Sequence, residues 1–117
     1  MLGVMYVNHW GVEQDHEQAV IWYRKAIAAG NKTAMTNMGY MYEMGWGVQK
    51  DDQQAIDWYR KAATAGNAEG MVHLGNRYEE GRGVEKDRQQ AINWYRKAAQ
   101  LGNEYAKDQL KRLGESP

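Results

Sequence analysis

Residues 32–67 read KTAMTNMGYMYEMGWGVQKDDQQAIDWYRKAATAGN, and residues 68–103, which follow directly, read AEGMVHLGNRYEEGRGVEKDRQQAINWYRKAAQLGN. The two stretches are identical at 21 of 36 aligned positions, where chance at ordinary residue frequencies gives about two. Trp22, Trp58 and Trp94 keep the same spacing of 36 residues, so the period extends toward the N-terminus. Self-similarity at a fixed period of this length is typical of stacked repeat proteins.

The period divides the chain of 117 residues into four parts. Residues 32–67 and 68–103 are complete units, called repeats two and three below. Residues 1–31 match the later part of a unit and are interpreted as a partial first repeat. Residues 104–117 begin a fourth unit, which we interpret as a C-terminal capping helix and tail, because a terminal repeat needs a polar outer face. The N-terminus shows no such cap, so we expect a longer array or a second copy at that end.

Each complete unit is predicted to contain two helices. In repeat two, Ala34, Met38 and Tyr42 recur every four residues, which favours one face of a first helix over about residues 33–43. Asp51 with Gln54 three residues later is a pattern found at helix starts. The same pair recurs as residues 15 and 18 and as residues 87 and 90, and Gly-Asn ends each second helix. The sequence therefore predicts an all-α chain.

Glycines recur inside the first helices, at Gly3, Gly39 and Gly75. Glycine within a helix costs about 1 kcal/mol relative to alanine, so a glycine in every copy indicates a close helix approach. We expect the Trp-Tyr pair of the second helix, Trp58-Tyr59 in repeat two, to pack on this bare backbone.

Glycine-rich turns are expected to join the two helices, at residues 45–47 and 81–83. In the first unit the turn is expected at residues 8–11, where His9 replaces the leading glycine and tolerates positive φ better than most residues. Trp10 and Trp46 occupy the position that holds Arg82 in repeat three, so we expect this position to be exposed. The three tryptophans of the second helices are expected in the core.

Composition excludes several classes of function. Lys plus Arg and Asp plus Glu are both 15, which leaves no basic excess for nucleic-acid binding. No apolar run approaches the length of roughly 20 residues that a membrane span needs, and residues 1–7 lack a signal-peptide pattern. With no cysteine there is no disulfide, thiolate metal site or cysteine nucleophile. The absence of cysteine does not determine the cellular compartment, because reducing and oxidising compartments both tolerate it.

Residues that could carry catalysis or bind metal are few and scattered. His9, His16 and His73 lack the spacing of a helical zinc pair, and Ser116 is the only serine. The aspartates at 15, 51 and 87 are better explained as helix caps. The basic pairs that begin at Arg24, Arg60 and Arg96 are interpreted as a solvated face, with a phosphate-binding track as the alternative. We therefore expect no catalytic residue, no metal and no cofactor.

The repeated positions resemble the Sel1-like repeat. The residues of repeat two that carry the resemblance are Met38-Gly39, Tyr42, Gly45, Gly47-Val48, Asp51, Ala55, Trp58-Tyr59, Lys61-Ala62-Ala63 and Gly66. The resemblance implies a right-handed α/α solenoid related to tetratricopeptide repeats, of bacterial type, that acts as an adaptor for protein partners. One cysteine-rich branch of this family is linked to penicillin binding or β-lactam hydrolysis, but this chain has no cysteine. A cell-wall or β-lactam hydrolase and a purely structural segment remain alternatives to the scaffold.

A partner is expected on the concave side, which the first helices line in solenoids of this kind. Positions that vary between copies while the core positions stay constant are predicted to face outward and bind an extended or helical peptide with apolar and basic side chains. The alternative is a solvated face without a partner. The predicted residues are Thr33, Thr36, Tyr40, Glu43, Met44, Glu69, Val72, Asn76, Glu79, Glu80, Tyr105, Asp108 and Arg112, with Val4, Val7 and Asn8 in the first unit.

Overall fold

The computed structural model describes residues 2–115, with side chains from residue 15 onward. All regular structure in this part of the chain is helical, which confirms the all-α prediction. The helices are α1 (Leu2–Ala28), α2 (Lys32–Met44), α3 (Asp52–Thr64), α4 (Ala68–Glu80), α5 (Arg88–Gln100) and α6 (Glu104–Arg112).

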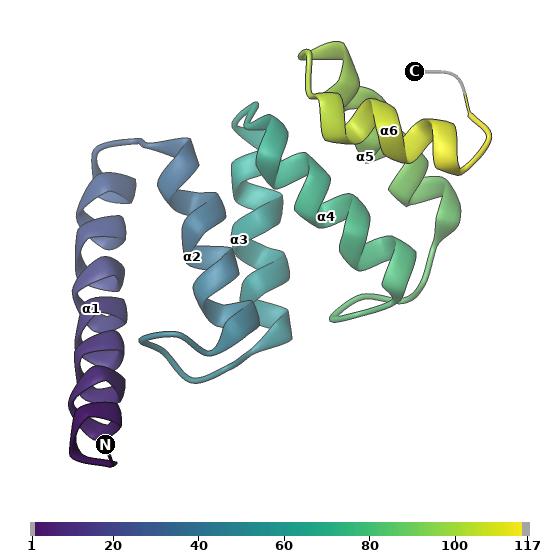
Figure 1. Ribbon diagram of the computed structural model, residues 1–117. Coiled ribbons are helices and arrows are strands. Elements are labelled where there is room, and N and C mark those ends of the chain that lie inside the picture. The colour runs from purple at the N-terminus through teal and green to yellow at the C-terminus, as the bar shows by residue number, and fades with distance from the viewer. Residues whose placement is uncertain (1, 116–117) are drawn as a thin grey trace.

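The helices stack in chain order into an elongated solenoid, which confirms the predicted fold class. Each helix packs on the next one, α2 also contacts α4, and α1 and α6 lie at opposite ends of the stack (Figure 1). The principal extents of 52 × 35 × 25 Å reflect this one-dimensional arrangement. The first helices α2, α4 and α6 form one surface of the stack, called the A-helix face below.

The predicted helix caps are present in the two complete repeats. The Asp51 carboxylate accepts the backbone N–H groups of residues 53 and 54 at 3.0 and 3.1 Å, and Asp87 accepts that of Gln90 at 3.1 Å. Gly66 adopts a φ of +94° just past α3, and Asn67 then caps α4 by accepting the Gly70 N–H at 2.8 Å. The Gly-Asn pair therefore ends one helix and begins the next.

The glycines inside α2 and α4 are contacted by tyrosines, as predicted. A Cβ added at Gly39 would lie 2.6 Å from Cδ1 of Tyr59, and one at Gly75 would lie 2.8 Å from Cε1 of Tyr95. Both tyrosines are fully buried. The tryptophan half of the prediction is wrong, because the nearest atoms to Gly39 come from Tyr59 and the Ala55 carbonyl.

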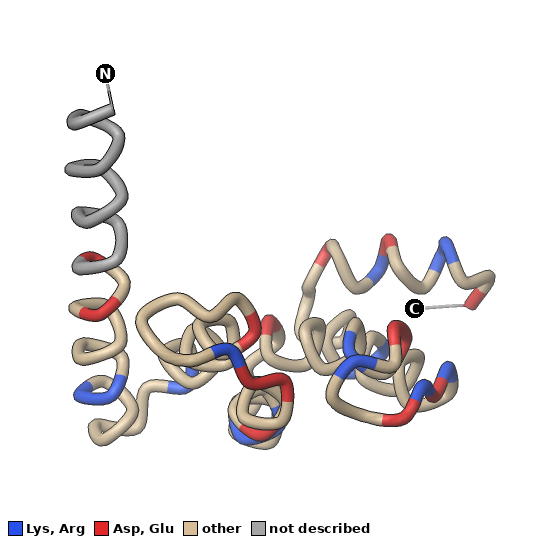
Figure 2. Tube along the Cα trace, turned by 90° about the horizontal axis from the view of Figure 1, so that it is seen from below, with Lys and Arg blue, Asp and Glu red and all other residues tan. Residues whose placement is uncertain are grey.

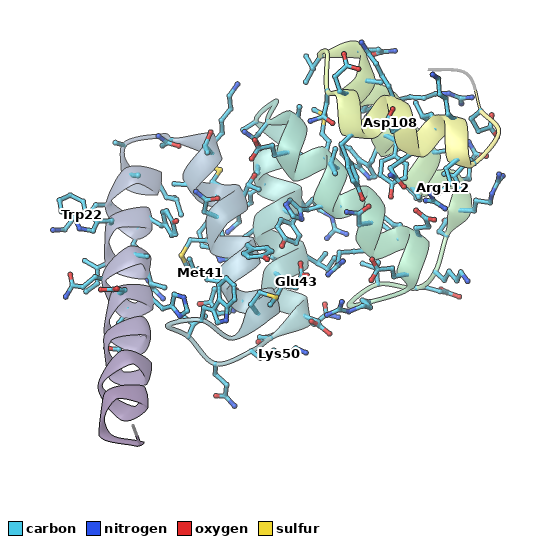
Figure 3. All side chains as sticks on the ribbon, viewed as in Figure 1. Trp22, Met41, Glu43, Lys50, Asp108 and Arg112 are labelled. Atoms are coloured by element: carbon cyan, nitrogen blue, oxygen red, sulfur yellow. The ribbon has the colours of Figure 1, made fainter. Side chains whose placement is uncertain are left out.

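The tryptophans of the second helices lie at the edge of the core and not within it. Trp58 and Trp94 are half-buried, whereas Trp22 is 66% exposed and points away from the stack (Figure 3). A lysine one turn later covers each ring, with Nζ at 5.2, 4.4 and 4.6 Å from the ring centroids of residues 22, 58 and 94. Basic and acidic residues are interspersed along the stack (Figure 2).

The first unit departs from the prediction. α1 continues through residues 8–11, so no turn forms there and Asp15 lies inside the helix instead of capping one. The physical reason is the replacement of glycine, because Gly45 and Gly81 end α2 and α4 at φ values of +71° and +70°, where a His9 side chain would be strained. The predicted close approach at Gly3 and the predicted exposure of Trp10 lie outside the described side chains.

The last helix covers the end of the larger hydrophobic cluster. Ala106 and Leu110 are fully buried, and Leu113 packs against the same cluster. Lys111 is exposed at the position where α2 and α4 have glycine. Those glycines contact a tyrosine of the helix that follows in the same repeat, and no described helix follows α6. Tyr105 of the same helix is 49% exposed.

Candidate functional site

The A-helix face carries the predicted partner-binding residues, but two of them are buried. Thr36 is 2% exposed and Val72 is 8% exposed, so the expectation that they face outward is wrong. The Thr36 hydroxyl donates to the Asn67 side chain at 2.8 Å and lies beside the backbone of Gly70. This repeat position is buried in both copies although its residue differs, so variation alone does not indicate exposure. Val4, Val7 and Asn8 lie outside the described side chains.

Glu43 of α2 is held by its own repeat and by the next one. The Tyr59 hydroxyl donates to Oε1 of Glu43 at 2.6 Å, and Nη1 of Arg77 lies 2.7 Å from Oε2. Arg77 is 5% exposed and also pairs with Glu80 at 3.1 Å. Glu43 and Arg77 therefore form a short, largely buried ion pair between α2 and α4.

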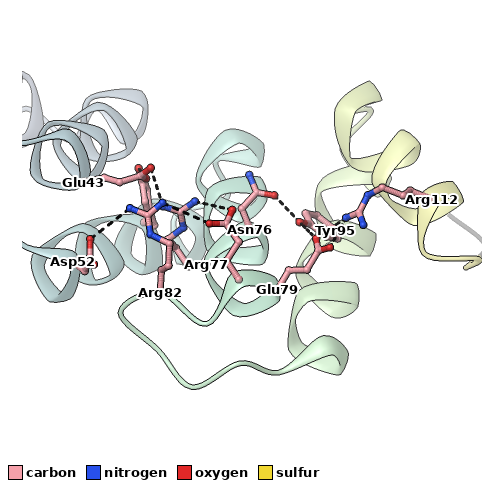
Figure 4. Close-up of polar contacts among 10 residues, drawn as sticks. Glu43, Asp52, Asn76, Arg77, Glu79, Arg82, Tyr95 and Arg112 are labelled. Carbon is pink, nitrogen blue, oxygen red and sulfur yellow. Dashed lines mark hydrogen bonds and ion pairs between the residues drawn. The ribbon is translucent and has the colours of Figure 1, made fainter.

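Glu79 of α4 repeats the arrangement one unit later. The Tyr95 hydroxyl lies 2.9 Å from Oε1 of Glu79 and also contacts Oδ1 of Asn76. Nη2 of Arg112 from α6 donates to both oxygens of Glu79 (Figure 4). Four of the predicted site residues are therefore engaged inside the molecule: Glu43, Asn76, Glu79 and Arg112. The Glu43–Arg77 and Glu79–Arg112 pairs connect successive repeats, whereas Asn76 contacts Tyr95 of its own repeat.

The electrostatics of these carboxylates favour a structural role. Burial alone would raise the pKa of Glu43, but the Tyr59 hydrogen bond and the Arg77 charge lower it below the ordinary value. Glu79 shows the same balance, with Arg112 and Tyr95 lowering its pKa. Burial and the adjacent carboxylates raise the pKa values of Tyr59 and Tyr95. The carboxylates stay charged and the phenols stay protonated at neutral pH, which does not suit proton transfer.

A row of aromatic rings crosses the repeats beside these ion pairs. His16 of α1 stacks on Trp46 with 4.7 Å between the ring centroids, and Tyr40 lies edge-on to Trp46 with a centroid distance of 5.4 Å. Tyr40 also lies 6.0 Å from His73, which stacks on Tyr59 at 4.7 Å. Trp46 is half-buried in this row, so the expectation of an exposed loop tryptophan is wrong. Stacking with neighbouring repeats orders the loop between α2 and α3.

Sequence reasoning missed one position on the A-helix face. His73 corresponds to Asn37 in α2 and Gln109 in α6, and all three are half-buried. Burial lowers the pKa of His73 despite the opposing charge of Glu43, which favours a neutral imidazole. The change of residue type at this position in each copy was the available signal.

The remaining predicted residues are available for contact. Tyr40 is half-buried, and Met44 is 42% exposed. The exposed carboxylates among the predicted residues are Glu69 and Glu80 of α4 and Asp108 of α6. Glu80 pairs with Arg77 and Arg82. The exposed predicted residues are Thr33, Met44, Glu69, Glu80, Tyr105, Asp108 and the paired Arg112. The face therefore combines acidic groups with aromatic and apolar ones.

The part of the chain that the structure describes spans residues 2–115. Within this range, no three His, Asp or Glu side chains lie close enough together to form a candidate metal site. No described helix is both long and apolar enough to cross a membrane.

Comparison with known proteins places the chain in a group. The family model of the Sel1 repeat matches residues 1–31, 32–67 and 68–103, and such repeats generally serve as protein–protein interaction scaffolds. No curated protein matches.

Three solved bacterial structures are similar over most of the chain. A protective antigen of uropathogenic Escherichia coli strains with an SLR fold, c5321, is 44% identical with a TM-score of 0.80, over 96% of this chain and 24% of its own. A Sel1 repeat protein from Oxalobacter formigenes is 37% identical with a TM-score of 0.80, over 86% and 40%. Helicobacter pylori cysteine rich protein B is 32% identical with a TM-score of 0.70, over 74% and 65%. The chain thus spans less than half the length of the first two.

Proposed function

Because the chain belongs to the Sel1 repeat family, we propose that it is an interaction scaffold that binds a peptide or protein partner on the A-helix face. The observation that carries the proposal is the pair of Glu–Tyr–Arg contacts across this face. Glu43 and Glu79 each accept from a tyrosine of their own repeat and pair with an arginine of the next. These contacts hold three first helices at a set spacing.

A preformed surface binds more tightly because less conformational freedom is lost on binding. The carboxylates of Glu43 and Glu79 on the A-helix face already have partners within the chain, so a ligand meets an ordered surface. Tyr40 is held between Trp46 and His73 in the same way. Side chains that are both ordered and accessible are the usual anchors of an interface.

The chemistry of the accessible side chains indicates the class of ligand. Glu69 and Asp108 contribute negative charge, and neither forms an ion pair with another described residue. Met44 and Tyr105 contribute exposed apolar surface, at 42% and 49%. A peptide with basic and apolar side chains complements this combination.

A random-sequence peptide library displayed on phage tests this proposal. We expect the chain to select basic peptides with apolar residues, and the variant Tyr40→Ala/Glu69→Lys/Asp108→Lys to bind them at least about tenfold more weakly. A matched control, Asp57→Lys/Asn93→Lys, changes exposed positions of α3 and α5 and should bind like the wild type. Circular dichroism would confirm equal helicity.

Other outcomes of this selection contradict the proposal. Equal loss in both variants would place the binding surface elsewhere. If no peptide is enriched, a structural segment without a partner is favoured. Turnover of a chromogenic β-lactam at a catalytic rate would instead favour the hydrolase alternative, for which no observation in the described residues speaks.

A further inference from the structure

The outward side of α1 differs from the outward sides of the other second helices. Ile21 occupies the repeat position that holds Asp57 in repeat two and Asn93 in repeat three. Ile21 is 46% exposed, and the two polar equivalents are exposed as well. An apolar side chain therefore stands in water at a position where the other copies carry a polar one.

Ile21 belongs to an exposed stripe on α1 and is not an isolated surface residue. Neighbours at spacings of three and four lie on one helix face, and Trp22 beside Ile21 is 66% exposed. The equivalent Trp58 and Trp94 instead pack against hydrophobic clusters. We define the α1 stripe as the exposed residues Glu17, Ile21, Trp22, Lys25 and Ala28.

We propose that the full chain forms a dimer in which the α1 stripes of two copies pack against each other, antiparallel about a two-fold axis at Ile21. Charge complementarity selects this occupant and this direction. Glu17 lies four residues before Ile21 and Lys25 four residues after it, so antiparallel helices bring Lys25 of each copy level with Glu17 of the other. Parallel helices would bring Lys25 against Lys25.

The two-fold arrangement also accounts for the apolar residues. Ile21 meets its own copy at the axis, and Trp22 of each chain flanks this contact, so both lose their exposure to water. Lys25 already lies over the Trp22 ring at 5.2 Å, which keeps the ammonium group near the seam. The α1 stripe shares no residue with the A-helix face, so both copies keep that face open.

Sedimentation equilibrium of the full chain over a wide concentration range tests the dimer. We expect a reversible monomer–dimer equilibrium. Glu17→Lys and Lys25→Glu each place like charges opposite each other twice, so each alone should raise the dissociation constant at least about tenfold. Mixing these two variants restores complementary charges across the interface, and a heterodimer of near wild-type affinity should form.

Two further variants complete the design. Ile21→Asp introduces the residue type of repeat two and should abolish the dimer while leaving the helical circular dichroism unchanged. Lys61 lies on α3 at the repeat position of Lys25, so Lys61→Glu should leave association unchanged. A wild-type chain that stays monomeric at every concentration overturns the proposal. So does a dimer that ignores the single reversals, or a mixture that gives no heterodimer.

Discussion

The two junctions between first helices use the same kind of acceptor but differ in burial. At the α2–α4 junction, the side chains of Glu43 and Arg77 are 11% and 7% exposed. At the α4–α6 junction, those of Glu79 and Arg112 are 26% and 50% exposed. Arg77 corresponds to Met41 of repeat two. Arg112 comes one residue before the position in the fourth unit that corresponds to Arg77. The glutamate is constant in the two complete repeats, and the arginine reaches it from different positions.

The difference teaches that similar contacts contribute unequally to stability. Removing one partner of a buried ion pair leaves an uncompensated charge and costs about 3–5 kcal/mol. An exposed pair contributes about 0–1 kcal/mol because water and salt screen it. The α2–α4 junction is therefore expected to be the more sensitive of the two. Three predictions test this difference, in order of decreasing effect.

The largest effect is expected for Arg77→Met, which introduces the residue type of repeat two. We expect the free energy of unfolding to fall by about 3 kcal/mol, because Glu43 stays buried without its cation. Urea denaturation followed by circular dichroism measures the change. The double variant Arg77→Met/Glu43→Gln removes both charges and keeps an acceptor for Tyr59, so it should recover most of the loss. A loss under 1 kcal/mol for the single variant would contradict the assigned difference between junctions.

A smaller effect is expected when the tyrosine hydroxyls are removed. Tyr59→Phe should cost about 2 kcal/mol, since it takes a donor from the buried Glu43. Tyr95→Phe should cost about 1 kcal/mol, because water can replace the hydroxyl at the more exposed Glu79. The same denaturation experiment compares the two. The reverse order would show that burial does not govern these contacts.

The smallest effect is expected for Arg112→Ala, at about 0.5 kcal/mol near neutral pH. Arg112 and Tyr95 lower the pKa of Glu79 against the effect of burial, so the contribution is present above the ordinary carboxyl pKa of about 4.3. It is lost as the pH falls through the lowered pKa of Glu79. Stability curves of wild type and variant should therefore converge in acid and in high salt. A difference that grows on acidification would be inconsistent with this linkage.

Part of the candidate site could be predicted from the sequence. Comparison of the copies correctly identified exposed positions such as Met44, Glu69 and Asp108. It failed for Thr36 and Val72, which differ between the copies although both are buried. It also did not reveal that Glu43 meets Arg77, since a pair 34 residues apart in the chain has no local pattern.

The sequence by itself determined the repeat period, the helices of the complete repeats, their aspartate caps and the glycine–tyrosine packing. These features depend on a short-range spacing of residues that recurs in each copy. Hydrogen bonding and steric contacts within one repeat therefore decide them. The tertiary structure alone decided which varying positions are buried and which glutamate meets which arginine. It also showed α1 continuing past residue 9, where no left-handed glycine is present to end it. Burial and pairing depend on neighbouring repeats, which act on a residue only after the helices have stacked.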